Sequence, residues 1–163
     1  MRSEPSIQEL IFSIIDFFKA LDPKKFNDIR DYIDLLEVNS INENKINKVI
    51  DYINNKLIGN LISHDRFYAF VARNSLQIII REINLINNFE EKENIRLESL
   101  LKKKGNTREL NKILCERIKT RQIDRKDCEL KEHLIKTTMA KLAIDQPNYS
   151  GYLKALKDKY PKD

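Results

Sequence analysis

Apolar residues recur every three or four positions along almost the whole chain, and this spacing constrains the fold more than any other feature. In the first run, apolar side chains fall at offsets of 0, 3, 4, 7, 8, 11 and 14 from Ile7 and reach Leu21. That period places them on one face of an α-helix. No segment alternates as a strand does, and three glycines leave little material for tight hairpins. The sequence therefore predicts an all-α fold, a helical bundle of six or seven mostly antiparallel helices.

Capping and turn residues divide this pattern into helices. Ser6-x-x-Glu9 is typical of a capping box, and Asp22-Pro23 indicates that a second helix begins there. A long run from about Asp65 to Asn87 carries two apolar stripes, which predicts a helix at the centre of the bundle. A separate helix is predicted over Glu90–Lys103. Further helices are predicted to begin at Ser40-x-x-Glu43, at Thr107 and at Asp124 or Asp127. Helix ends are predicted at Gly59-Asn60, Gly105 and Pro147, and a short last helix near Tyr152–Tyr160.

Positive charge is concentrated in one part of the chain. Residues 101–141 hold 13 Lys and Arg against 6 Asp and Glu, whereas residues 1–100 hold 13 against 16. A solvated helix face is the favoured interpretation of this stretch. The alternative is a basic helical module that binds nucleic acid or another anionic ligand through residues 102–126. Because no Phe, Tyr or Trp occurs in 101–141, nucleic acid lacks a stacking surface and is not favoured.

The sequence contains no motif typical of catalysis, metal binding or membrane insertion. His64, His133, Cys115 and Cys128 lack the spacing of a zinc site, and no glycine-rich phosphate loop or nucleophile motif occurs. We therefore expect no cofactor and no enzymatic activity of its own. No apolar run approaches the roughly 20 residues of a membrane span, and the N-terminus lacks a signal-peptide pattern. These observations predict a cytoplasmic protein that does not enter a membrane.

Two polar features stand apart from an ordinary helix surface. Asn74 shares a stripe with Phe67, and Arg81-Glu82 follows on the same side. A structural network is the favoured interpretation, because buried polar groups are usually satisfied internally; direct contact with a ligand, or a role in a small enzyme, is the alternative. The second feature is the segment Leu142–Gly151, which combines a helix-ending Pro147 with Tyr149. This segment predicts either a rigid turn that ends the helix or a docking surface for a partner.

The same segments resemble a bacterial family of small helical proteins of unknown function. The positions that carry the resemblance are Phe67, Val71-Ala72, Asn74, Leu76, Ile78 and Arg81-Glu82; then Leu110-Asn111, Ile118 and Ile123-Asp124; then Leu142-Ala143-Ile144-Asp145-Gln146-Pro147, Tyr149, Ser150 and Gly151. The resemblance implies a family helical domain over 39–152, an N-terminal helical extension over 1–38 and a short C-terminal tail over 153–163.

The resemblance also implies a function. Members of that family are encoded beside aminoglycoside-phosphotransferase-like kinases and acyl-CoA dehydrogenases, and one resembles an accessory subunit of a levulinate-pathway 4-hydroxyacyl-CoA kinase. We therefore expect a non-catalytic partner of a phosphotransferase-fold kinase, with acyl-CoA near the interface and a possible homo-oligomer. The residues expected to bind a partner or ligand are Phe67, Asn74, Arg81, Glu82, Asn111, Asp145, Pro147, Tyr149, Ser150 and Gly151.

Overall fold

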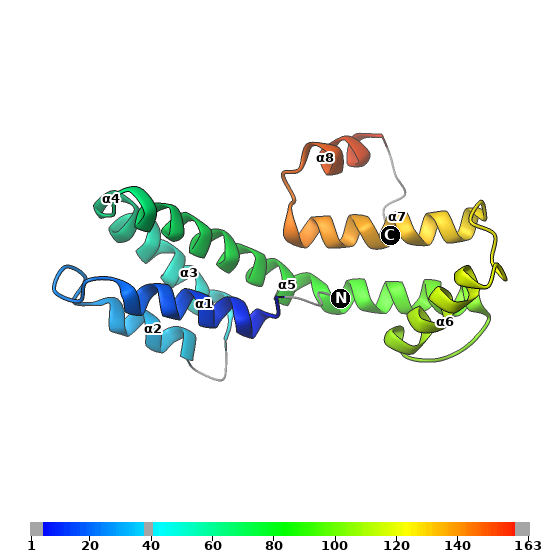
Figure 1. The fold of residues 1–163 in the computed structure, drawn as a ribbon, viewed down its shortest axis with the longest axis horizontal. Coiled ribbons are helices and arrows are strands. Elements are labelled where there is room, and N and C mark those ends of the chain that lie inside the picture. The colour runs from blue at the N-terminus through cyan, green and yellow to red at the C-terminus, as the bar shows by residue number, and fades with distance from the viewer. Residues whose placement is uncertain (1–4, 38–40, 159–163) are drawn as a thin grey trace. The chain divides into compact units, whose positions relative to one another are not determined.

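The computed structural model describes residues 5–37 and 41–158, and every regular element within these ranges is helical (Figure 1). This confirms the predicted all-α fold. The elements are α1 (Ile7–Ala20), α2 (Ile29–Glu37), α3 (Glu43–Tyr52), the π-helical η1 (Ile53–Leu57), α4 (Ile58–Asn60), α5 (Ser63–Leu101), α6 (Thr107–Lys119), α7 (Cys128–Asp145) and α8 (Ser150–Lys157).

The chain forms two compact units, and each is described by itself. The N-terminal unit ends at Glu82, and the C-terminal unit begins at Ile83. The boundary falls within α5, so this helix contributes its first half to one unit and its second half to the other. Each unit has its own cluster of buried apolar side chains.

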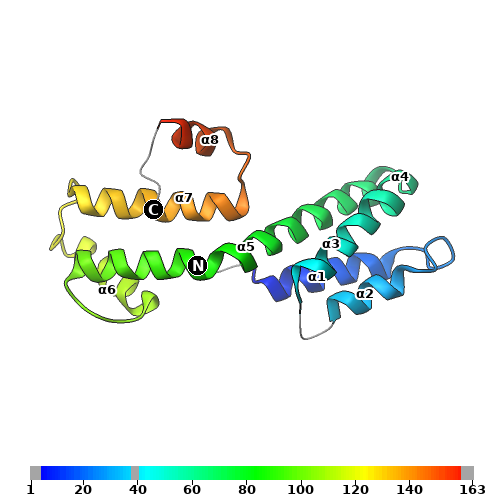
Figure 2. The same cartoon turned by 180° about the vertical axis from the view of Figure 1, so that it is seen from behind.

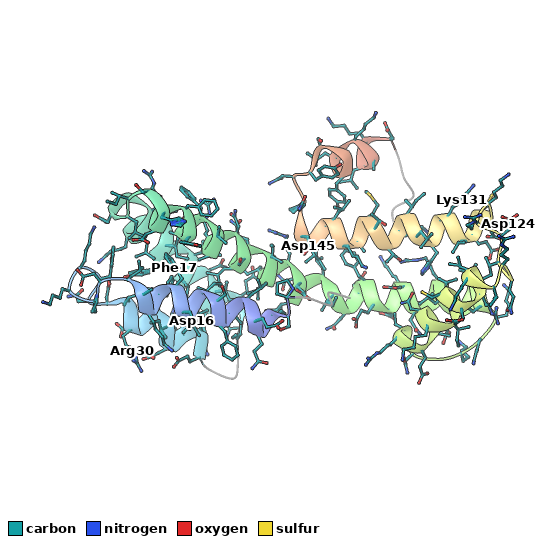
Figure 3. The ribbon with its side chains drawn as sticks, in the orientation of Figure 1. Asp16, Phe17, Arg30, Asp124, Lys131 and Asp145 are labelled. Atoms are coloured by element: carbon teal, nitrogen blue, oxygen red, sulfur yellow. The ribbon has the colours of Figure 1, made fainter. Side chains whose placement is uncertain are left out.

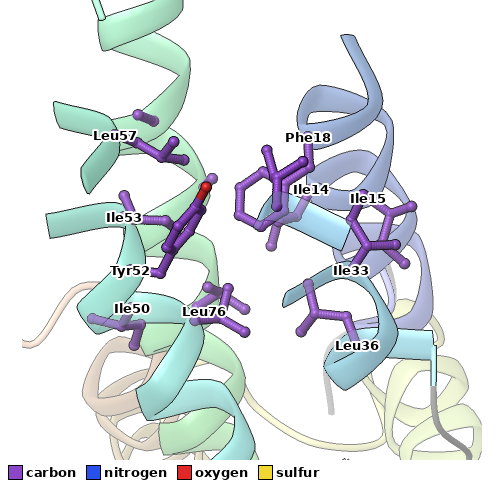
Figure 4. Close-up of a cluster of buried hydrophobic side chains, with 14 of the residues drawn as sticks. Ile14, Ile15, Phe18, Ile33, Leu36, Ile50, Tyr52, Ile53, Leu57 and Leu76 are labelled. Atoms are coloured by element: carbon purple, nitrogen blue, oxygen red, sulfur yellow. The ribbon is translucent and has the colours of Figure 1, made fainter. Parts of the chain in front are cut away.

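In the N-terminal unit, α1 begins at the predicted capping box and buries its predicted apolar face. Ser6 Oγ accepts the Glu9 N–H at 3.2 Å, and the Glu9 carboxylate accepts the Ser6 N–H at 2.7 Å, which satisfies two N–H groups that a helix start leaves unpaired. The buried side chains of α1, α2, α3, η1 and α5 meet in one cluster (Figure 4). Those at its centre include Phe18, Ile33, Ile53, Leu57 and Leu76.

Two helix starts differ from the prediction. The segment after Asp22 forms turns, and α2 begins only at Ile29. The Asp22 carboxylate accepts the Lys24 N–H at 2.9 Å, and its carbonyl accepts the N–H of Phe26 at 3.0 Å, so Asp22 stabilises a turn and not a helix. Asn42 caps α3 through the Lys45 N–H at 3.1 Å, whereas the predicted cap at Ser40 lies outside the described residues.

Helix α5 is a single helix of 39 residues, and the predicted break between Asn87 and Glu90 is wrong. Ser63–Leu101 contains no glycine or proline, so nothing in the backbone ends the helix there. Its C-terminus also differs from the prediction. Lys102, with φ of 51°, takes the left-handed closing position, and Gly105 does not.

The C-terminal unit is built by α5, α6, α7 and α8. Its apolar cluster joins Leu97 and Leu101 of α5 to Leu110 and Leu114 of α6 and Leu130 of α7. Seen from behind, α6 follows the end of α5 through a short loop, and α7 leads into α8 (Figure 2). Asp127 caps α7 as predicted, through the Leu130 N–H at 2.9 Å.

The predicted cap of α6 is wrong. Asn106 takes that position and accepts the Glu109 N–H at 2.9 Å. Thr107 is the first helical residue, and its hydroxyl is within hydrogen-bond distance, 3.1 Å, of Asn94 Oδ1. None of the helices in the described ranges is both long enough and apolar enough to cross a membrane.

Candidate functional site

Helix α5 presents one of its two apolar stripes to solvent. Phe67, Val71 and Asn74 follow one another at intervals of four and three residues, which places them on one face. Phe67 is 61% exposed, and the other two are also exposed. In the second stripe, Leu76 and Ile79 are fully buried in the core, whereas Ile83 further along the helix is exposed.

Asn74 therefore does not occupy the buried position that the sequence predicted. Asn74 is exposed, and its Oδ1 accepts a hydrogen bond from the neighbouring Arg73 guanidinium at 3.4 Å. The interpretation that Asn74 ties helices together is wrong, because the face it shares with Phe67 points away from the core. We call the exposed group Phe67, Val71 and Asn74 the α5 face.

Arg81 and Glu82 lie at the boundary of the two units. Arg81 is half-buried and Glu82 is buried, and each takes part in an interaction within the protein. Both are on α5, about two turns beyond Asn74.

The closing motif forms a turn between α7 and α8 whose geometry depends on a glycine. Asp145 ends α7 (Figure 3), Pro147 follows in the turn, and Tyr149 occupies the N-cap position of α8. The Tyr149 ring lies over Gly151 so closely that a Cβ there would approach Tyr149 Cε1 to 2.6 Å. Since real Cβ atoms do not come so near, any side chain at 151 would displace the ring.

This turn leaves an aromatic ring and an apolar helix side accessible. Tyr149 is 52% exposed, and Ser150, the first residue of α8, is exposed beside it. Helix α8 has no fully buried residue, and its Leu153 and Leu156 are exposed. We call Tyr149, Leu153 and Leu156 the α8 face.

Asn111 has a structural position. Its amide Nδ2 donates to Glu93 Oε1 at 3.0 Å, which joins α6 to α5 inside the C-terminal unit. The predicted site residues thus fall into separate groups: Phe67, Asn74, Arg81 and Glu82 belong to the N-terminal unit, and Asn111, Asp145, Pro147, Tyr149, Ser150 and Gly151 belong to the C-terminal unit.

Comparison with known proteins identifies the family. A family model described as "Domain of unknown function (DUF6285)" matches residues 59–149. The chain belongs to this family. No curated protein and no solved structure matches it.

The DUF6285 match covers most of the predicted site residues. It begins at Gly59, near the end of α4, and ends at Tyr149. It contains the whole α5 face, Asn111 and the end of α7, and it stops immediately before Ser150 and Gly151. Helices α1, α2 and α3 precede the match.

Sequence reasoning missed a buried polar cluster in the C-terminal unit. Glu93 and His133 are both buried, on α5 and α7. Burial lowers the pKa of His133, the positive charge of Arg96 lowers it further, and Glu93 opposes them. Within the described ranges, His133 Nδ1 is buried and has no hydrogen-bond partner. The sequence did contain a sign that Glu93 is buried, because Glu93 precedes Leu97 and Leu101 at intervals of four residues on the same face of α5.

Metal chemistry gains no support from this cluster. Across residues 5–37 and 41–158, no group of three or more His, Cys, Asp or Glu side chains is arranged to hold a metal ion. The cluster joins α5, α6 and α7 and holds an uncharged imidazole in the interior.

Proposed function

We propose that this DUF6285 protein is a non-catalytic accessory subunit of an aminoglycoside-phosphotransferase-like hydroxyacyl-CoA kinase. It would act in the cytoplasm, in the catabolism of acyl-CoA or short-chain acids. The kinase would supply the ATP and magnesium site, and this chain would stabilise the kinase or help to shape its acyl-CoA pocket. The resemblance described above supplies the identity of the partner.

The α5 face carries the proposal. Phe67 and Val71 belong to the signature helix of the family resemblance, yet their apolar side chains are exposed. A signature position on the opposite stripe of the same helix, Leu76, is buried in the core. Core packing explains the buried stripe and leaves the exposed one unexplained. An aromatic residue beside an aliphatic one is typical of the centre of a protein interface, because such side chains gain most from leaving water.

The α8 face supports the same conclusion independently, from the other unit. The exposed Tyr149 ring occupies the space above Gly151 that a side chain there would fill. Together with Leu153 and Leu156 it leaves an aromatic and two aliphatic side chains accessible to a partner.

Co-expression with the kinase that the proposal places beside this gene tests the proposal. We expect the wild-type chain to co-purify with the kinase and to raise its ATP turnover with a hydroxyacyl-CoA. A Phe67→Ala variant should weaken the complex by about 2 kcal/mol, or about 30-fold in Kd, as truncation of a central aromatic residue does. Affinity is measured by titrating labelled kinase with each variant.

The chain offers a matched control for Phe67. Phe12 lies on α1 in the same unit and is 54% exposed, against 61% for Phe67. A Phe12→Ala variant should bind the kinase as the wild type does. Failure of the wild type to co-purify, or equal weakening by the two substitutions, would refute the proposed docking surface.

A further inference from the structure

The loop between α5 and α6 carries three consecutive lysines, and the first of them has an uncommon conformation. Lys102 is left-handed, with φ of 51°, and the N–H of Lys103 bonds to the Glu98 carbonyl at 3.3 Å. This is a helix closure that usually employs glycine. We call Lys102, Lys103 and Lys104, together with Lys112 of α6, the lysine corner.

The lysine corner borders two surface hollows. The first has a volume of about 390 Å³ and is lined by Ile95, Glu98, Ser99 and the three consecutive lysines. The second, of about 300 Å³, is lined by Lys103, Lys104, Gly105, Glu109, Leu110, Lys112 and Ile113. Lys103 and Lys104 border both hollows, and each hollow has apolar side chains beside its lysines.

One carboxylate neutralises one of these lysines and organises the loop. Lys104 Nζ lies 2.6 Å from Glu98 Oε2, and this hydrogen bond lowers the pKa of Glu98. The other oxygen of Glu98 accepts the Gly105 N–H at 3.4 Å. Among the residues that the structure describes, Lys102, Lys103 and Lys112 form no ion pair. Glu109, on the rim of the second hollow, is the remaining acidic residue.

We propose that the lysine corner binds a nucleoside diphosphate or a closely similar small molecule. Its phosphates would lie between Lys102 and Lys103, because the carboxylate of the first hollow, Glu98, is already paired with Lys104. Its organic part would cover Ile95, an apolar side chain that is exposed on the wall of the first hollow. The volume of that hollow falls in the range of about 300–1,000 Å³ that small-molecule sites occupy.

A small molecule fits this site better than a single-stranded nucleic acid does. Neither hollow has an aromatic lining residue, and single strands are held largely by stacking on aromatic rings. The proposed site lies in the C-terminal unit and needs no partner protein. It is therefore independent of the proposed kinase complex and can be tested on the purified chain alone.

Calorimetric titration of the full chain with ADP and with inorganic pyrophosphate tests the site. Both probes should bind, and both should bind more weakly when salt rises from about 50 mM to about 200 mM. ADP should bind more tightly than pyrophosphate, because it also covers Ile95. Lys103→Ala should lower the affinity for each probe by about tenfold, whereas Lys24→Ala, at an exposed lysine of the α1–α2 turn, should leave both unchanged.

A second variant distinguishes the contribution of the first hollow to affinity from that of the lysine charges. Ser99 is exposed on the wall of the first hollow, so Ser99→Trp should fill the hollow without disturbing the core. We expect this variant to abolish the advantage of ADP and to leave the affinity for pyrophosphate unchanged. The proposal is overturned if neither probe saturates, if the two probes bind equally to the wild type, if Lys103→Ala matches Lys24→Ala, or if only an oligonucleotide binds.

Discussion

The two histidines of the chain provide an internal comparison of buried and exposed imidazoles. His133 is 4% exposed, on α7, while His64 is exposed in the first turn of α5. Burial and the charge of Arg96 lower the pKa of His133 against the opposing effect of Glu93. The unfolded chain therefore takes up a proton on this residue at a higher pH than the folded chain does. The stability that the neutral imidazole confers is complete at high pH. It is lost as the pH falls below 6.5, the ordinary pKa that the histidine has in the unfolded chain.

The size of this loss follows from the linkage of protonation to unfolding. Each pH unit between the unfolded pKa and the lowered folded pKa removes up to about 1.4 kcal/mol from the free energy of unfolding. Between about pH 7.5 and about pH 5.5, the loss attributable to His133 thus reaches up to about 1.4 kcal/mol. Most carboxylates remain ionised over this interval.

Urea unfolding followed by circular dichroism at the two pH values measures this dependence. A His133→Leu variant, which has no titratable group at that position, should lose less stability on acidification than the wild type by the same amount. His64→Gln should behave as the wild type does. An NMR titration of the imidazole C–H signals should give a pKa below 6.5 for the resonance that disappears in the His133 variant. The reasoning is refuted if that resonance titrates above 6.5, or if the His133 and His64 variants show the same dependence on pH.

Three further substitutions test other contacts. Ser6→Ala removes the capping box of α1 and should lower the free energy of unfolding by about 1 kcal/mol in urea titration; no change would show that the cap is not stabilising. Tyr52→Phe removes the hydrogen bond, 2.9 Å long, from the phenol to Asp28. Burial raises the pKa of Asp28, but the hydrogen bonds from the phenol and Lys56 outweigh it and lower this pKa. We therefore expect the free energy of unfolding to fall by about 1.5 kcal/mol near neutral pH, and by less once the solution is acidified below about pH 4. Gly151→Ala should displace the Tyr149 ring and weaken kinase binding about tenfold with little change in the thermal midpoint, and unchanged binding would exclude a positioning role for this glycine.

Much of the fold follows from local patterns in the sequence. The period of α1 appears in the structure as predicted, and Asp127, one of the two predicted cap positions, caps α7. Each depends on residues within one or two turns of each other, so sequence spacing is sufficient to find them. The start of α2 was misplaced because Asp22-Pro23 suits a turn as well as a helix start.

The candidate site was less accessible from the sequence. Spacing identified Phe67 and Asn74 as members of one stripe, but it treated that stripe as buried. The turn around Tyr149 was recognised from Pro147 and Gly151, whereas the contact between the Tyr149 ring and Gly151 became visible only in three dimensions. The hydrogen bond between Asn111 and Glu93 joins residues 18 positions apart on different helices, beyond the reach of any local pattern.

By itself, the sequence determined that this chain is helical, where most of its helices lie and that its positive charge is concentrated after residue 100. These properties are set by backbone preference and composition, which act over a few residues. Tertiary structure alone decided which apolar residues of α5 are covered and that His133 lies in the interior. The reason is that burial is a property of what packs against a residue, and the packing partners come from distant parts of the chain.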